Sequence, residues 1–414
     1  MNVEERITAV RRLCSFEGRV AGTDAERRAA NDLAVQLREL GHRTDVEPTY
    51  VHPQWPLVQA LHALLALAGS LVAIEEPAVG FGIVLVTLAS MYLDLNGRFY
   101  LLRRLFFRRA SQNVVSRGGR HDAAGTLVLC ANYDAGRSGI AYGRRWRGLA
   151  ARVGRLLGVP FSPGRLVFWS AAVLLPLIGL RMAEVESNLI SVLQLPPTLV
   201  LVFAIFLLVD IQLSDATPSA NLNASGVATA LSLAAELERE APAELDVWIV
   251  LPGADDPFHT GIRHFVRAHR DELDRETTWY LAVEGVGAGD VRFTTSQGPV
   301  VSYGMASRLT ELCAAIADAD ADRDDPLGAR PLRSGFGSGS LAAVLAKYPS
   351  TTVTCLEPGE LLPAAAHSAR DVPDVLDPDA MERAHRFCLE LIRALDRDLA
   401  RKRDREGEPE SAVV

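Results

Sequence analysis

The fold is decided by Asn221-Leu222-Asn223-Ala224-Ser225-Gly226, a polar turn that opens a helix. The helix is predicted by the apolar spacing that follows, in which one face carries Val227, Ala230, Leu231, Ala234 and Leu237. Two continuous apolar runs, 245–251 and 279–283, have the length of strands that helices cover on both sides. These patterns together predict an α/β domain.

Other short polar segments lie before a predicted helix or after a predicted strand in the same way. Thr23 and Glu26 have the spacing of a capping box at the start of the first helix. In chain order the segments are Gly18 to Thr23 before that helix, Asn132-Tyr133-Asp134 after a strand at 126–131, Gly253-Ala254-Asp255-Asp256 after 245–251, Glu284-Gly285 after 279–283, and His367. Their order makes them more specific together than any one of them is alone.

Two pairs of apolar runs interrupt this domain, at 57–74 with 78–93 and at 166–180 with 198–213. As helices, runs of this length span roughly 23–27 Å at 1.5 Å per residue, close to the ~30 Å hydrocarbon core of a bilayer. They predict two membrane hairpins. The alternative, four helices buried in a globular domain, is disfavoured by the charges beside them.

Arginines cluster on one side of each hairpin. After the first hairpin come Arg98, Arg103, Arg104, Arg108 and Arg109, and before the second come Arg144, Arg145, Arg147, Arg152, Arg155 and Arg165. The opposite tips carry Glu75, Glu76, Glu184 and Glu186. Because basic residues concentrate on the cytoplasmic flank, the sequence predicts a multi-pass protein of the cell membrane with its α/β domain in the cytoplasm.

The overall composition limits the partners. The hydrophobic fraction of 49% is high for a wholly soluble protein, and the net charge of −8 argues against a nucleic-acid partner. The basic clusters beside the hairpins are expected to meet anionic membrane lipid. Five scattered cysteines suggest reduced thiols rather than a disulfide framework.

These short segments, in this order, resemble those of the M28 family of di-zinc exopeptidases. The resemblance covers residues 15–50 and 110–398. The resemblance implies a mixed sheet flanked by helices, of the phosphorylase/hydrolase-like, zinc exopeptidase type, with ligand residues on loops at the carboxyl ends of strands. The predicted organisation is 1–55, first part of the M28-like domain; 56–95, first transmembrane hairpin; 96–160, further strands and basic juxtamembrane segments; 161–213, second hairpin; 214–400, remainder of the domain; and 401–414, a disordered tail.

In the M28 family, two zinc ions lower the pKa of a shared water and an adjacent carboxylate accepts its proton. The resemblance puts Asn132 at the first histidine ligand, with Asp134 at the aspartate that orients it. Leu222 stands where an aspartate bridges the two ions. The general-base position is occupied by Asp255, and the remaining ligand positions by Asp256, Glu284 and His367.

The number of ligands left at these positions is low. One metal position would keep Glu284 with the weak ligand Asn132, and the other would keep Asp256 with His367, whereas zinc sites use three or four protein ligands. Zinc is therefore expected to bind at most weakly or at a single site. An alternative is one metal held by Asp256, Glu284 and His367, helped by His259 or His264. Each residue also has a structural interpretation, since acids such as Asp255 and Asp256 favour helix N-termini.

Three functions follow as hypotheses. The first is a membrane-anchored M28-like protein, catalytically impaired, that binds a peptide or protein partner in the former active-site cleft. The second is an active zinc-dependent aminopeptidase or other hydrolase with a rearranged metal site. The third is a transporter component, which is disfavoured because the only acids in the apolar segments, Asp94 and Asp210, lie near their cytoplasmic ends.

Overall fold

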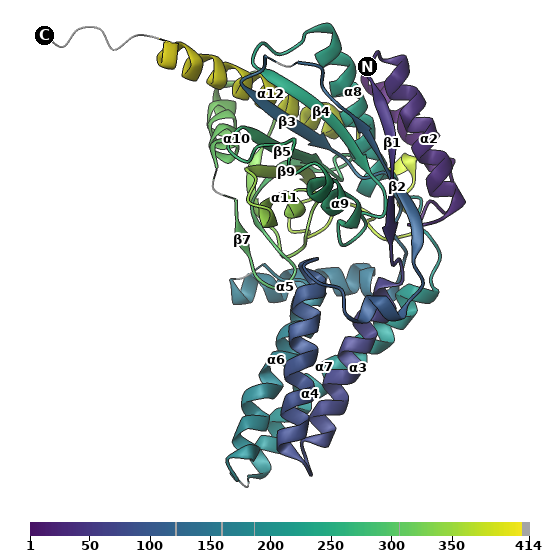
Figure 1. Ribbon diagram of the computed structural model, residues 1–414, viewed down its shortest axis with the longest axis vertical. Helices are drawn as coiled ribbons and strands as arrows, with labels where there is room; N and C mark the ends of the chain where they lie inside the picture. Colours follow the sequence, from purple (N-terminus) through teal and green to yellow (C-terminus); the bar gives the residue numbers. More distant parts are fainter. Residues whose placement is uncertain (121, 159, 186, 306, 408–414) are drawn as a thin grey trace, which may run out of the picture.

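The computed structural model describes residues 1–407 except 121, 159, 186 and 306. An α/β domain carries the N-terminus and the last helix, and a bundle of long helices extends from one side of it (Figure 1). The domain contains one mixed sheet with helices on both faces. The predicted fold class is confirmed.

The sheet runs in the order β1-β2-β4-β3-β5-β9-β6-β7, with β8 paired to β6. Its central strands β4, β3, β5 and β9 are parallel, and antiparallel pairs flank them. The strands are β1 (Thr44–Val51), β2 (Arg109–Ser116), β3 (Gly125–Cys130), β4 (Leu245–Pro252), β5 (Thr278–Val283), β6 (Asp290–Gln297), β7 (Tyr303–Gly304), β8 (Arg330–Arg333) and β9 (Ser350–Leu356).

Helices cover both faces of this sheet. One face packs against α1 (Val3–Cys14), α2 (Asp24–Glu39), α8 (Ser225–Arg239), α10 (Arg308–Asp318) and α12 (Pro378–Gly407). The other face packs against α9 (Thr260–Ala268) and α11 (Leu341–Leu345). The central strands are thus buried on both sides, which is why they read as continuous apolar runs.

The capping box predicted at the first helix is only half formed. The Thr23 side chain accepts a hydrogen bond from the Glu26 N–H (3.2 Å), as expected. The Glu26 carboxylate, however, turns inward and accepts from the Ala254 N–H (2.9 Å) and from the Ser111 hydroxyl (2.7 Å). Burial raises the pKa of Glu26 to about 7. This carboxylate therefore ties α2 to the loop after β4.

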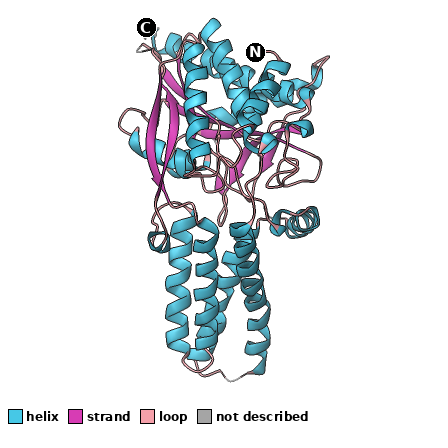
Figure 2. Cartoon of the chain, turned by 90° about the vertical axis from the view of Figure 1, so that its right-hand side faces the viewer, coloured by secondary structure: helices cyan, strands magenta, loops and turns pink. Residues whose placement is uncertain are grey.

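Four helices are long and apolar enough to cross a membrane: α3 (Trp55–Val72), α4 (Pro77–Leu95), α6 (Pro163–Met182) and α7 (Asn188–Leu213). They stand side by side below the domain (Figure 2) and share a small apolar core. Of the most apolar window, 50% is buried in α3, 44% in α4, 28% in α6 and 22% in α7, so at least half of each window is exposed. The alternative of helices buried in a globular domain therefore does not hold.

The fourth apolar helix is longer than predicted. The sequence predicts 198–213, but α7 begins at Asn188 and continues through Pro196 and Pro197. Next to the prolines, the Gln194 side chain donates to the Ser70 carbonyl of α3 (2.9 Å), and the Thr198 hydroxyl donates to the Gln194 carbonyl (2.8 Å). Proline is more frequent in membrane helices than in soluble ones.

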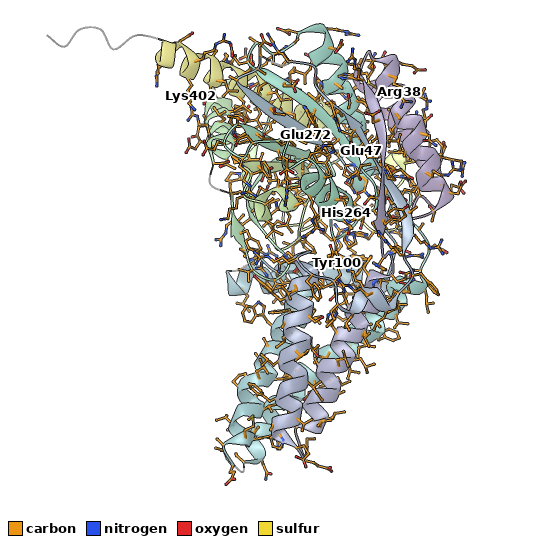
Figure 3. The ribbon with its side chains drawn as sticks, viewed as in Figure 1. Arg38, Glu47, Tyr100, His264, Glu272 and Lys402 are labelled. Carbon is orange, nitrogen blue, oxygen red and sulfur yellow. The ribbon has the colours of Figure 1, made fainter. Side chains whose placement is uncertain are left out.

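A buried ion pair joins the bundle to the domain. Asp94, at the end of α4, accepts two hydrogen bonds from Arg103 (2.7 and 3.0 Å) and one from Gln59 (2.7 Å). The Arg103 guanidinium also lies over the rings of Tyr100 (4.7 Å) and Phe258 (5.2 Å). Figure 3 shows Tyr100 where the two parts of the molecule meet. One structural role of Asp94 is therefore to hold this junction.

Helix α5 (Arg144–Leu157) lies crosswise between domain and bundle (Figure 1). The sequence predicts basic residues here but no helix. Its arginines are interspersed with exposed apolar side chains, Trp146, Leu149 and Leu156. Trp146 also packs near Phe203 of α7, with ring centroids 5.4 Å apart. A basic, amphipathic helix at this level has the character of one that lies in a membrane interface.

The predicted disordered tail at 401–414 is wrong in its first part. Residues 401–407 continue α12, and 408–414 lie outside the described residues. Contacts with the domain explain the longer helix. Asp396 accepts from the backbone N–H of Glu244 (2.7 Å), and Arg403 donates to the Glu244 carboxylate (3.0 and 3.1 Å).

Candidate functional site

The predicted site residues lie just beyond three parallel strands. Asn132 and Asp134 follow β3, Asp255 and Asp256 follow β4, and Glu284 follows β5. Since β4, β3 and β5 are adjacent and parallel, their carboxyl ends meet at one edge of the sheet. A cavity lies at this edge, and its wall is formed both by these loops and by the ends of the bundle helices.

The Asn221 to Gly226 segment forms a π-helical turn, η3 (Ala220–Ala224), and the first residues of α8. The Asn221 side chain accepts from the Gly287 N–H (2.7 Å), and the Ser225 hydroxyl donates to the Asn221 carbonyl (2.6 Å). At Gly226 a Cβ atom would lie 2.1 Å from the Val283 carbonyl oxygen, so only glycine fits. The segment thus locks α8 against β5, whatever the chemistry of the site.

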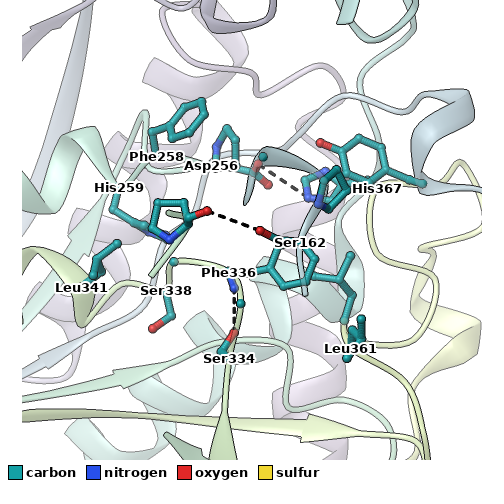
Figure 4. A pocket seen from close by; sticks show the side chains of 18 of the residues that line it. Ser162, Asp256, Phe258, His259, Ser334, Phe336, Ser338, Leu341, Leu361 and His367 are labelled. Atoms are coloured by element: carbon teal, nitrogen blue, oxygen red, sulfur yellow. Dashed lines mark hydrogen bonds and ion pairs between the residues drawn. The ribbon is translucent and has the colours of Figure 1, made fainter. Parts of the chain in front are cut away.

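One cavity of about 280 Å³ is lined by all five predicted metal-ligand positions, Asn132, Leu222, Asp256, Glu284 and His367. Figure 4 shows two of them, Asp256 and His367, in this cavity. At Leu222 the backbone N–H donates to Asp371 (3.2 Å), which also accepts from the Asn221 N–H (2.6 Å). Burial raises the pKa of Asp371 to about 6, although these two bonds oppose the rise. An apolar side chain therefore occupies the cavity wall at the family's bridging position.

Asp134 joins the loops that follow β3 and β4 and does not line the cavity. It is fully buried, and one of its oxygens accepts from the N–H groups of both Asp255 (3.0 Å) and Asp256 (3.1 Å). Its other oxygen accepts from the Asn132 amide at 3.4 Å. Burial, with the charges of nearby acids, raises the pKa of Asp134 well above its usual value. The structure thus places Asp134 beside Asn132.

Asp256 and His367 are brought together across the cavity. The carboxylate lies 3.9 Å from Nε2 of His367, and the imidazole stacks on the Tyr142 ring with centroids 4.1 Å apart. Gly136 packs tightly behind them, since a Cβ there would lie 2.7 Å from each side chain. Among the described residues, Nδ1 of His367 is buried without a hydrogen-bond partner. Such a nitrogen can accept a hydrogen bond from a bound ligand.

A second cluster joins Asp255, His259 and Glu284, whose ligand atoms all lie within 4.8 Å of one another. Asp255 accepts from Nδ1 of His259 (3.1 Å) and from the Ile262 N–H of α9 (2.8 Å). Both of its oxygens are therefore engaged, as the helix-capping interpretation predicts. Within the described part of the chain, Nε2 of His259 is buried and without a hydrogen-bond partner.

Negative charge is concentrated around Glu284. Burial, together with the charges of Asp255 and Asp256, raises the pKa of Glu284 to about 7, although His259 and the Gly339 N–H oppose the rise. At His259 burial lowers the pKa, but the hydrogen bond to Asp255 and the charges of Asp255 and Glu284 together outweigh burial, and the pKa is raised. The site therefore favours a cation or a bound proton.

The backbone beside the site is strained at several non-glycine residues. Ala254, His259 and His367 have φ values of 49°, 52° and 54°, in the left-handed region. Such conformations cost about 1–3 kcal/mol each and concentrate at functional sites. Here they turn the loops so that His259 and His367 reach the cavity wall.

The residues at the family positions do not fit two zinc ions. Leu222 has no ligand atom, and the Asn132 amide donates to Asp134. Asp256 with His367 forms a two-donor pair, and Glu284 lies in the second cluster. A single divalent cation fits better at Asp255, His259 and Glu284, because three donors of suitable type converge there.

Sequence reasoning left open whether His259 or His264 helps to hold a metal. The structure brings His259 to the site, whereas His264 bonds the Thr49 hydroxyl of β1 and does not line the cavity. The contact of Tyr142 with His367 was missed. Tyr142 belongs to an irregular segment, η2 (Ile140–Tyr142), and its sequence carries no periodicity that could have revealed the contact.

Solved structures of other proteins, among them a zinc exopeptidase, share this fold. A Zn-dependent exopeptidase from Parabacteroides distasonis is 11% identical, with a TM-score of 0.53 over 94% of this chain and 97% of that one. LapB from Legionella pneumophila is 11% identical, with a TM-score of 0.53 over 96% and 72%. A glutaminyl cyclase from Bacteroides thetaiotaomicron, bound to N-acetylhistamine, is 12% identical, with a TM-score of 0.55 over 95% and 97%. The class of fold is therefore that of the zinc exopeptidases.

The model of peptidase family M28 matches residues 209–392, which include the turn at Leu222, both acids after β4, Glu284 and His367. The chain thus contains an M28-like domain. A search of curated proteins found no match.

Proposed function

We propose that the protein is a membrane-anchored member of this fold class that has lost two-zinc peptidase chemistry and keeps the cleft as a binding site for a peptide or a protein partner. The observation that carries the proposal is Leu222 on the cavity wall with Asp256, Glu284 and His367. A bridging carboxylate is what holds two zinc ions a few ångströms apart, and leucine supplies none.

The arrangement of Asp255 supports the loss of catalysis. A general base must reach the proton that it abstracts. Here both oxygens of Asp255 are bonded, to His259 and to the Ile262 N–H, and its side chain is buried. The retained cavity supports binding, because concave, mostly apolar sites with a few convergent polar groups are typical ligand sites.

The four apolar helices and α5 support anchoring in the cell membrane, with the domain on the cytoplasmic side. The exposed apolar side chains of α5 would enter the interface, and its arginines would meet anionic lipid.

This orientation predicts the labelling of introduced cysteines. In intact cells, a membrane-impermeant maleimide should label Glu75→Cys, at the outer tip of the first hairpin, and leave Asp325→Cys unlabelled until the cells are lysed. Four of the five native cysteines are buried, so the background is low. Labelling of Asp325→Cys in intact cells would show the opposite orientation.

The second candidate function is a hydrolase with a rearranged, single-metal site. The observation that favours it is the cluster of Asp255, His259 and Glu284, with Nε2 of His259 unpaired within the described residues. A divalent cation bound there would act as a Lewis acid and lower the pKa of a bound water. This function requires a bound metal ion, whereas the first candidate function does not.

His259→Ala tests this single-metal site. If a cation binds at the cluster, the parent protein should retain one zinc per chain after dialysis and His259→Ala should retain none. His264→Ala, one turn further along α9, should match the parent, because His264 contacts Thr49 instead. Zinc that survives His259→Ala but is lost in His367→Ala would place the metal elsewhere and reject this cluster.

A further inference from the structure

The cavity at the site continues into the helix bundle. Beyond the polar residues, its wall is formed by the domain ends of all four apolar helices, through Trp55, Met91, Leu95, Val167, Ala204 and Leu208. Ala204 precedes the end of α7 by nine residues, which places it roughly 14 Å into the bundle at 1.5 Å per residue. One continuous space therefore connects the former metal positions with the level of the membrane.

The two ends of this space differ in polarity. The inner end carries Asp256, Glu284, His259 and His367, whereas the bundle end is apolar apart from Gln59, whose amide nitrogen donates to Asp94. A peptide backbone against the apolar wall would leave buried N–H and carbonyl groups without hydrogen-bond partners, which is unfavourable. An alkyl chain would lose nothing there. This distribution of polar and apolar residues along the cavity wall thus favours a molecule with one polar end and one apolar end.

The charges at the inner end indicate the head group. Asp256 and Glu284 face the cavity, and Asp134 and Asp255 lie buried behind it. Nδ1 of His259 is bonded to Asp255, and Nε2 is buried and without a hydrogen-bond partner within the described part of the chain. Arg263, also on the wall, is directed to backbone carbonyls, among them that of Phe258 at 3.0 Å. Acceptors and negative charge therefore dominate, and they favour a head that donates hydrogen bonds and carries positive charge.

We propose that the cavity binds a single-chain amphiphile with a primary amine head, which enters from the bilayer with its alkyl chain between the four helices and its ammonium group at Asp256, Glu284 and the two histidines. The volume of about 280 Å³ suits one chain, since it lies near the lower end of ligand pockets, which measure roughly 300–1,000 Å³. This inference rests on one part of the proposed function, the loss of the two zinc ions, because it requires those positions to be free for a ligand; it replaces the peptide or protein partner with an amphiphile.

Dodecylamine is the probe for the test, measured by equilibrium binding to the full chain in lipid nanodiscs and corrected for empty nanodiscs. The parent protein should show one saturable site. Dodecanoate, which has the same chain with an anionic head, and butylamine, which has the head with a short chain, should compete at least tenfold more weakly. Equal competition by dodecanoate, or displacement by a soluble tripeptide as effective as dodecylamine itself, would overturn the proposal.

Two variants of α7 locate the chain. Ala204→Phe fills the cavity and should weaken dodecylamine binding at least tenfold, whereas Val202→Phe, whose side chain points out of the bundle, should bind as the parent does. At the head, Asp256→Asn should weaken dodecylamine but not the uncharged dodecanol, which keeps the test valid if Ala204→Phe fails to fold. Parent-like binding by Ala204→Phe would contradict the proposal. The zinc content of the same samples separates the two failures: two zinc ions per chain would refute the proposed function, whereas low zinc with no amine binding would refute only the amphiphile.

Discussion

The double variant Asn132→His with Leu222→Asp is expected to gain a zinc-dependent stability that the parent protein lacks. Both positions line the cavity with Asp256, Glu284 and His367, so the changes would bring five donors to one space. A ligand that binds only the folded state stabilises it by about 4 kcal/mol at a thousand times its Kd. Thermal unfolding with and without zinc should therefore show a much larger rise in Tm for the double variant than for the parent.

Leu222→Asp alone is the control for this experiment. It adds a carboxylate near Asp256 and Glu284 without the histidine, so repulsion should raise a carboxyl pKa and lower the Tm in the absence of metal. Zinc should recover less of the loss than in the double variant. Equal zinc shifts in the parent and the double variant would mean that residues 132 and 222 do not share a metal-binding space.

Removing the charge of Asp94 should produce the other large effect, on stability. Asp94 and Arg103 have side chains that are 0% and 4% exposed, and they hold α4 to the loop that reaches Phe258 on the cavity rim. Asp94→Leu leaves the guanidinium buried without a counter-charge, and breaking such a pair costs about 3–5 kcal/mol. A clear fall in the Tm of the detergent-solubilised protein is expected.

The matched control is Asp94→Leu combined with Arg103→Met. Replacing a buried pair by apolar residues of similar volume is often neutral, because no isolated charge remains. The double variant should therefore unfold well above Asp94→Leu, and below the parent only by the loss of the acceptor of Gln59. If both variants were destabilised equally, the loss would come from packing rather than from the unpaired charge.

The sequence predicts the central layers of the fold because burial leaves a direct signal there. Strands β3, β4 and β5 are covered on both faces, so their apolar runs are continuous and their ends can be placed. Strands β6 and β9, with mixed burial or polar composition such as Ser350 to Thr354, carry no such run. Helix α5 was missed because its basic character masks the apolar spacing of Trp146 and Leu149.

The site residues divide in the same way, into those next to a buried strand, which the sequence can place, and those that it cannot. Residues at strand ends, such as Asn132 and Glu284, can be placed from the strands that precede them. The contact between Asp255 and His259 depends on a left-handed turn at His259, and the stacking of Tyr142 on His367 joins segments far apart in the chain. Neither has a signature in a single sequence, so the choice of His259 over His264 required the structure.

The central claim, that this chain has lost the two-zinc centre, is tested most directly by the zinc content per chain of the parent protein, purified without chelators and measured by elemental analysis. The account predicts at most one zinc per chain. Two zinc ions per chain, lost together with hydrolysis of aminoacyl substrates in His367→Ala, would show that ligands from elsewhere replace Asn132 and Leu222, and would contradict it.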